Sequence, residues 1–95
     1  MNRQYARGRA YEYKALIKLR EEGWLAQRSA ASHSPIDIFA GKGAQTVLIQ
    51  IKSGKARVKE ADRQVLREWA QAFNAKAEIW HFQKRKAISV ELVFP

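Results

Sequence analysis

Residues 34–52 of the chain read SPIDIFAGKGAQTVLIQIK. Two short apolar runs flank Gly41-Lys42-Gly43, which is typical of a turn. The pattern predicts a strand over Ile36–Ala40 and a second strand over Thr46–Lys52. With so short a connection, the two strands are expected to pair as a β-hairpin, and the rest of the fold is built around it.

Helical periodicity appears on both sides of this hairpin. It predicts one helix from about Gln4 to Glu22, stopped by Gly23, and another from about Val58 to Asn74. Further strands are predicted over Trp24–Ser29, Lys76–Gln83 and Ala87–Phe94. The order α-β-β-β-α-β-β predicts an α/β fold, in which a mixed β-sheet is flanked by helices.

Each predicted helix has a stripe of residues expected to face the core. In the first helix the stripe consists of Tyr5, Glu12, Ala15, Leu16 and Leu19. In the second helix it consists of Ala61, Val65, Leu66, Trp69, Ala72 and Phe73.

The charge is strongly positive for a chain of 95 residues. Eighteen Lys and Arg against nine Asp and Glu give a net charge of +9 and a pI near 10.3. A field of this sign favours polyanions, nucleic acid first among them, although an even spread of charge for solubility remains an alternative. The length suits a single domain over residues 1–95, and its modest core makes a homodimer reasonable.

Composition also excludes several classes of protein. Without cysteine, disulfides and thiolate metal sites are excluded. No apolar run approaches the length of a membrane span, and the first residues lack the apolar segment of a signal peptide. We therefore expect no membrane partner and a cytoplasmic location.

Three polar side chains of the hairpin are candidates for a metal site. Gln50 and Lys52 share one face of their strand, roughly 7 Å apart. Alternation predicts that Asp37 points to the face opposite Ile36 and Ile38, and pairing of the strands brings it near Gln50. The spacing alone is a weak pattern, and the polar face of a half-exposed hairpin explains it equally well.

Glu12 stands on the stripe of the first predicted helix. A carboxylate there needs a partner, because an unpaired buried charge is costly. A salt bridge to Arg9 or to a neighbouring Lys is one explanation, and a place beside the hairpin acid is another. Gly8, one turn earlier, has no side chain and lets a strand or a phosphate come close.

These residue types suit the hydrolysis of a phosphodiester. A hard cation neutralises the phosphate and binds the attacking water. Mg²⁺ takes oxygen ligands and often uses only one or two carboxylates, which Glu12 and Asp37 supply, while Gln50 adds a neutral oxygen. Lys52 would stabilise the charged phosphate or position the water, and a nearby cation lowers the pKa of such a lysine.

Three motifs occur in a fixed order along the chain: Gly8-Arg9-Ala10-Tyr11-Glu12, the stretch Arg28–Asp37, and Val47–Ser53. In this order they resemble the archaeal-type Holliday junction resolvases, which also occur in phages, within the PD-(D/E)xK nuclease superfamily. The resemblance covers about the first 55 residues and continues more loosely through the second helix. It implies a restriction-endonuclease-like fold and a homodimer in a prokaryotic or phage-infected cell. The implied activity is Mg²⁺-dependent cutting of four-way DNA junctions, with Mn²⁺ able to substitute.

The resemblance implies a role for each matching residue. It assigns the metal positions to Glu12, Asp37 and Gln50. It makes Lys52 the catalytic lysine and Ser32 a loop serine that assists catalysis. Arg28 matches a basic residue needed for junction binding or cleavage, and Trp69 with Phe73 resembles an aromatic pair that could hold the junction or the dimer. Plain core packing is the alternative for that pair.

Gln50 departs from the family pattern, which usually has an acid at this position. Some related nucleases of the Mrr type are similar in having Gln there, so the change does not disqualify the site. It removes one negative charge, and we expect weaker metal affinity before the substrate binds. The scissile phosphate could supply the missing charge.

Basic residues near both ends of the proposed site are candidates for phosphate contacts, which give affinity without sequence choice. They are Arg3, Arg7, Arg9, Arg28, Lys55, Arg57 and Lys59. Two alternatives to a junction resolvase remain open. One is a Mrr-like or repair endonuclease acting on other DNA, and the other is a non-catalytic basic DNA-binding module.

Overall fold

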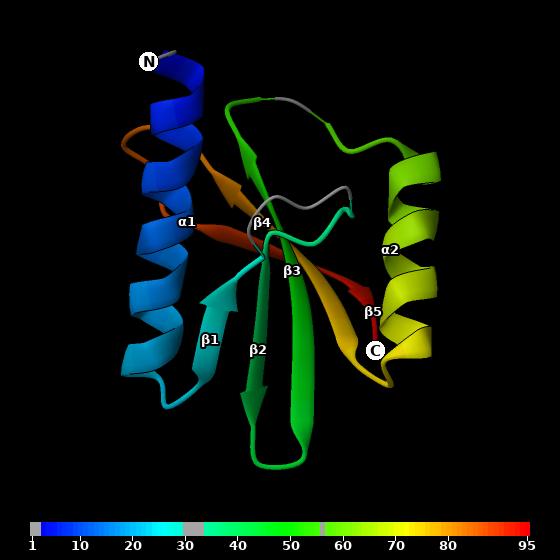
Figure 1. Ribbon diagram of the computed structural model, residues 1–95. Coiled ribbons are helices and arrows are strands. Elements are labelled where there is room, and N and C mark those ends of the chain that lie inside the picture. Colours follow the sequence, from blue (N-terminus) through cyan, green and yellow to red (C-terminus); the bar gives the residue numbers. More distant parts are fainter. Residues whose placement is uncertain (1–2, 30–33, 56) are drawn as a thin grey trace.

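A computed structural model describes residues 3–29, 34–55 and 57–95 (Figure 1). The elements are α1 (Arg3–Glu21), β1 (Leu25–Arg28), β2 (Ile38–Lys42), β3 (Gln45–Ser53), α2 (Glu60–Ala72), β4 (Lys76–Phe82) and β5 (Ser89–Phe94). The predicted order of helices and strands is confirmed. No helix in these described ranges is both long and apolar enough to span a membrane.

The strands form one five-stranded sheet in the order β1-β2-β3-β4-β5. Neighbours pair antiparallel except β3 and β4, which run parallel because α2 returns the chain between them. The start of β2 and the ends of β3 and β4 therefore meet at one end of the sheet, the upper end in Figure 1. That end carries the residues of the candidate site.

The two helices cover opposite faces of the sheet (Figure 1). Successive side chains of β3 point in turn to the face covered by α1 and to the face covered by α2, as strand geometry requires. Val47 and Ile49 pack in one buried cluster with Leu16 of α1, whereas Leu48 packs in another with Leu66 of α2. The sheet is thus buried on both faces at its centre, and only its ends can hold polar groups without a large desolvation cost.

Helix α1 ends as its sequence predicts. Gly23 has φ +92°, and the N–H groups of Gly23 and Trp24 donate to the carbonyls of Arg20 and Leu19. These are the two hydrogen bonds of a Schellman motif, in which glycine takes the left-handed position at no steric cost. Lys42 Nζ then donates to the Glu22 carbonyl at 2.7 Å, which ties the helix end to the hairpin.

Two sequence predictions need correction. The hairpin turn is Gly43-Ala44 rather than Gly41-Lys42-Gly43, because β2 continues through Lys42 and pairs it with Gln45. Gly43 has φ +60°, which a two-residue turn of the II′ kind requires at its first position.

The second correction concerns the stripe of α2. The buried residues of this helix are Leu66 and Ala70, and Trp69 and Phe73 are 38% and 57% exposed. The core-packing interpretation of this aromatic pair is therefore wrong. By contrast, the apolar stripe of α1 is buried as predicted, at Ala15, Leu16 and Leu19.

Candidate functional site

Asp37 lies at a bend where the chain enters β2. Ile36 packs in the cluster on the α2 face, whereas Ile38 packs in the cluster on the α1 face. Regular alternation puts these two residues on one face, so that prediction is wrong. Ser34 Oγ accepts a hydrogen bond from the Ile36 N–H at 3.2 Å, which helps to turn the chain just before the acid.

The bend holds the Asp37 side chain against the end of β3. The Asp37 N–H donates to the Ile49 carbonyl at 2.9 Å, and the Ile51 N–H donates to Asp37 Oδ2 at 2.7 Å. The carboxylate is thus fixed by the backbone of β3 between Gln50 and Lys52. Both the approach of Asp37 to Gln50 and its fixed orientation follow from this pairing.

Burial raises the pKa of Asp37 above its ordinary value. The hydrogen bond from the Ile51 N–H works in the opposite direction. The Glu12 carboxylate raises the pKa further, and the Lys52 ammonium lowers it. Residues from α1 and from β3 therefore act electrostatically on one partly buried acid, and a bound cation would offset the desolvation cost of its charge.

Glu12 reaches this acid from α1 and also forms an ion pair. Arg28 Nε lies 2.7 Å from Glu12 Oε1, and both side chains are partly buried. The sequence suggested a salt bridge to Arg9 or a nearby Lys, but the partner comes from β1. The guanidinium of Arg28 also lies 5.9 Å from the centre of the Tyr13 ring. No signal in the sequence links Glu12 to a residue sixteen positions later.

Gln50 carries the least satisfied polar group of the site. Its Oε1 atom is buried and has no hydrogen-bond partner among the described residues. A buried acceptor without a partner costs about 1–3 kcal/mol, so it calls for an explanation. A hard cation is one, because a carbonyl oxygen is a ligand that Mg²⁺ accepts.

The donor set tests whether a divalent cation fits here. No group of three His, Cys, Asp or Glu residues suited to a metal occurs in the part of the chain that the structure describes. A cation at this point would have two carboxylates, from Glu12 and Asp37, and the unpaired oxygen of Gln50. Two carboxylates and one carbonyl suit Mg²⁺, which completes its shell with water and phosphate oxygens.

Several residues singled out from the sequence lie elsewhere. Ser32 and the side chains of Arg3 and Arg7 are outside the described residues. The remaining basic candidates after β3 are exposed and form no ion pair within the described ranges: Lys55, Arg57 and Lys59. They stand at the site end of the sheet, beyond the last residue of β3.

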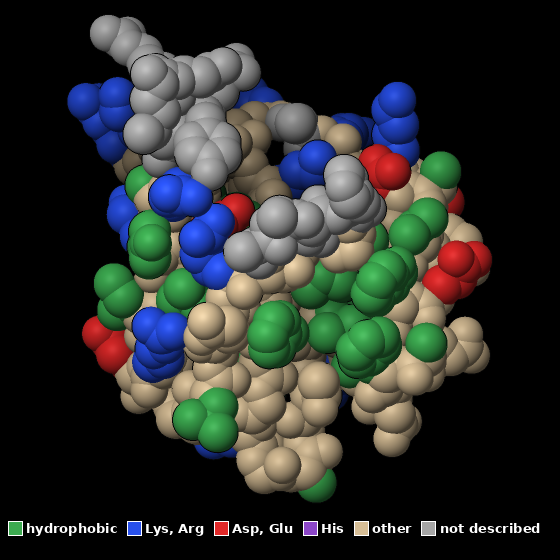
Figure 2. Space-filling model, in the orientation of Figure 1, with side chains coloured by type: hydrophobic (Ala, Val, Ile, Leu, Met, Phe, Trp, Pro, Cys, Tyr) green, Lys and Arg blue, Asp and Glu red, His purple; other side chains and the backbone are tan. Residues whose placement is uncertain are grey.

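An apolar face lies beside the site. The rings of Trp69 and Phe73 stack at 5.8 Å, and Phe39 of β2 is 47% exposed nearby. Ile36 and Leu48 form the floor of a hollow of about 270 Å³ between these rings. Figure 2 shows hydrophobic side chains gathered on this face, over the middle of the sheet and α2. Helical periodicity found the aromatic pair but could not tell that it is left uncovered.

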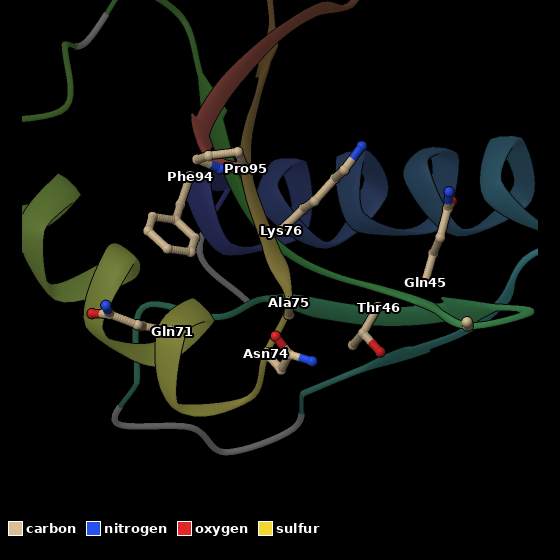
Figure 3. A pocket seen from close by; sticks show the side chains of 9 residues that line it. Gln45, Thr46, Gln71, Asn74, Ala75, Lys76, Phe94 and Pro95 are labelled. Atoms are coloured by element: carbon tan, nitrogen blue, oxygen red, sulfur yellow. The ribbon is translucent and has the colours of Figure 1, made fainter.

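A second hollow of about 270 Å³ lies at the opposite end of the sheet (Figure 3). Its polar lining consists of three amides, one hydroxyl and one lysine: Gln45, Gln71, Asn74, Thr46 and Lys76. No Asp or Glu side chain of the described residues lines it, and it lies far along β3 from Lys52. We therefore do not count it as part of the site.

Comparison with known proteins agrees with the geometry. The family model of the archaeal Holliday junction resolvases (Hjc) matches residues 3–94. The crystal structure of Hjc from Archaeoglobus fulgidus, a Holliday junction resolvase, is similar with a TM-score of 0.80 and 28% sequence identity. The match covers 92% of this chain and 73% of that one. No curated protein matches the chain in sequence.

Proposed function

Because this chain belongs to the archaeal Holliday junction resolvase family and is a junction-resolving endodeoxyribonuclease, we propose how its own residues carry out that reaction. A Mg²⁺ ion is held by Glu12, Asp37 and Gln50, and Mn²⁺ can substitute. The unpaired oxygen of Gln50 beside two interacting carboxylates is the observation that carries this proposal. When bound, the cation neutralises the scissile phosphate and favours ionisation of the attacking water.

The protein's residues orient and stabilise the reacting groups. The Ile51 N–H fixes the Asp37 carboxylate in one orientation, in which it would act as a cation ligand. Lys52, on the same strand face as Gln50, stabilises the charge that develops on the phosphate or positions the water. Ser32, which matches the family's loop serine, assists catalysis.

Arg28 has two roles: it pairs with Glu12 in the metal-free site, and it takes part in DNA binding. Its ion pair with Glu12 neutralises one carboxylate before the cation arrives. The planar fork of its guanidinium is also suited to a phosphate oxygen. The remaining phosphate contacts come from the basic residues Arg3, Arg7, Arg9, Lys55, Arg57 and Lys59. Most Lys and Arg side chains visible in Figure 2 lie toward the site end.

The active form is a homodimer that joins two copies through the apolar face of Phe39, Trp69 and Phe73. Two observations favour a second copy there: three exposed aromatic rings lie together, and a four-way junction has pseudo-two-fold symmetry that a two-fold dimer matches. Each active site then cuts one of two opposing strands. Residues 1–95 act as a single nuclease domain, and we infer a cytoplasmic location.

A nicking assay on a synthetic four-way junction tests the proposal. We expect symmetric cuts with Mg²⁺, none with EDTA, and none from the Lys52→Ala variant. A Lys52→Ala protein that still cuts would remove the lysine from the mechanism. Equal cutting of plain duplex would point to a Mrr-like or repair nuclease, and binding without any Mg²⁺-dependent cut to a non-catalytic module.

A further inference from the structure

A third hollow, of about 520 Å³, lies beside the site end of β3. It is enclosed by the loop that follows β3, the first turns of α2, and the adjoining ends of β4 and β5. The residues that matter here are Lys55, Arg57, Arg63, His81, Gln83 and Ser89. Every one of them offers a hydrogen-bond donor or a positive charge, and no carboxylate lines the hollow among the described residues.

The sheet register puts this hollow next to the proposed catalytic lysine. Lys52 of β3 pairs with His81 of β4, and His81 pairs with Ser89 of β5. Ile79 packs on the α2 face, so His81, two residues later, faces the same side as Gln50 and Lys52. Neighbouring strands are about 4.8 Å apart. Successive phosphates of one DNA strand are spaced by about 3.4 Å along the helix axis. A phosphate in the hollow would therefore lie within one or two nucleotides of a phosphate at Lys52.

An ion-pair network fixes one wall of the hollow. Arg63 Nε and Nη2 donate to the two oxygens of Glu91 at 2.8 and 3.0 Å, and Arg63 Nη1 donates to the Val58 carbonyl at 2.7 Å. His81 Nε2 lies 3.2 Å from Glu91 Oε1. The Arg63 hydrogen bonds hold the pKa of Glu91 below its ordinary value. The Glu91 carboxylate is therefore tied to two basic partners, and Arg63 balances its charge.

The opposite wall carries two cations that are not tied up in ion pairs with the described residues. Lys55 and Arg57 form no ion pair within the described ranges. Glu60, at the start of α2, is already paired with Arg67 at 2.7 Å. If these charges stood on a convex loop, solvation by water would explain them and no ligand would be needed. Here the charges border a concave space whose lining also includes Gln83 and Ser89, which can donate hydrogen bonds.

We propose that this hollow binds a second backbone phosphate of the DNA, within one or two nucleotides of the phosphate at Lys52. The inference rests on the proposed function, because it places the substrate strand across β3, β4 and β5. Lys55 and Arg57 supply charge, while Gln83 and Ser89 donate hydrogen bonds to phosphate oxygens. Holding two phosphates fixes the direction of the strand through the site, which a single contact cannot do.

The test is the salt dependence of four-way junction binding in EDTA, where no strand is cut. Each lost phosphate contact makes the slope of log K against log salt shallower by about 0.9. We expect that change for Arg57→Ala. Two matched variants each remove one charge outside the hollow: Lys84→Ala in the β4–β5 turn, close by, and Lys76→Ala at the far end of β4 (Figure 3). Both should keep the wild-type slope.

Gln83→Glu supplies a second measurement that does not remove a charged residue. It puts a carboxylate into the hollow, and we expect binding at least several-fold weaker than wild type. If Arg57→Ala and Lys84→Ala change the slope equally, only the general positive field acts and the second phosphate site is overturned. Wild-type protein that neither binds nor cuts a junction would instead overturn the proposed function.

Discussion

At its first residue, Gln45, strand β3 leaves a tight turn, and at its last residues it carries Gln50 and Lys52 into the candidate site. The two ends differ in how well their polar groups are satisfied. At the turn end, Gly43 has the required positive φ, and Lys42 caps the Glu22 carbonyl. At the site end, Gln50 Oε1 is buried without a described partner, and burial raises the pKa of Asp37.

The difference shows that the polar groups which destabilise the folded protein are concentrated at the site end of β3. Polar groups at the turn end use ordinary turn and cap hydrogen bonds, so they stabilise the protein by themselves. Those at the site end are held in an arrangement that a cation and a phosphate would complete. Local rules of stability are typically broken at functional sites, and the variants below break each end in turn.

Asp37→Asn should have the largest effect. Removal of this carboxylate takes away a proposed cation ligand, and we expect junction cutting to fall by at least about 10³-fold. An amide oxygen can still accept the Ile51 hydrogen bond, so the fold should remain intact. Single-turnover cutting at saturating Mg²⁺ measures the loss. Cutting within a few-fold of wild type would exclude Asp37 as a ligand.

The same variant also tests how the Asp37 carboxyl group affects the pH dependence of stability. Because the pKa of Asp37 is raised in the folded protein, the folded state binds the proton more tightly than the unfolded chain. The contribution of Asp37 to stability should therefore be lost as pH rises from the ordinary value of 3.8 through the raised pKa, so wild type should lose stability relative to Asp37→Asn over that range. Denaturant unfolding in EDTA at several pH values measures the difference. An equal advantage of Asp37→Asn at every pH would contradict a desolvated carboxylate.

Gln50→Glu sharpens the comparison at the site end. A third carboxylate should raise Mg²⁺ affinity without DNA by about 10-fold or more, because ligand charge tunes the affinity for such ions. In EDTA the same change should destabilise the protein, since it adds a charge beside Asp37 and Glu12. Calorimetric titration with Mg²⁺ and unfolding in EDTA test both effects. Loss of all metal binding would count against the ligand assignment.

Much of the fold could be predicted from the sequence because its signals are local. The hairpin alternation, the Gly23 stop and the apolar stripe of α1 each depend on neighbours along the chain. The bend at Asp37 is different. A single irregular residue transfers Ile36 and Ile38 to opposite faces, and no alternation pattern contains that information.

The site was harder to predict because its contacts are distant in sequence. The residue types of Glu12, Asp37 and Lys52 could be read from motifs, but the Arg28 partner of Glu12 could not. Periodicity also marks an apolar stripe without saying what covers it. It therefore assigned Trp69 and Phe73 to the core, although Leu66 and Ala70 fill that place.

Gly23→Ala tests the well-satisfied end. An L-residue in the left-handed region costs about 1–2 kcal/mol, and the new Cβ would meet only the flexible end of Lys42 at 3.4 Å. We expect the melting temperature to fall by about 4–8 °C for each kcal/mol lost, with unchanged cutting per folded molecule. Gly41→Ala is the control, since its Cβ has an ordinary contact at 3.7 Å. A similar loss at Gly41 would show that conformation at Gly23 is not the cause.

Gly8→Ala should have the smallest effect, and its two readouts should move in opposite directions. Glycine within a helix costs about 0.5–1 kcal/mol relative to alanine, and a Cβ at Gly8 would meet nothing within 4 Å. The variant should therefore be slightly more stable. Gly8 lies one turn before Glu12, so if the DNA strand passes there, the added methyl group should weaken junction binding a few-fold.

A compensated variant separates these two effects. Ala10 is exposed on the same helix, so Ala10→Gly should remove about as much stability as Gly8→Ala adds. The double variant should then melt like the wild type and still bind the junction more weakly. If it binds as tightly as the wild type, no strand approaches the helix at Gly8. The glycine would then be a stability cost without a role in DNA binding, and the site end would begin at Glu12.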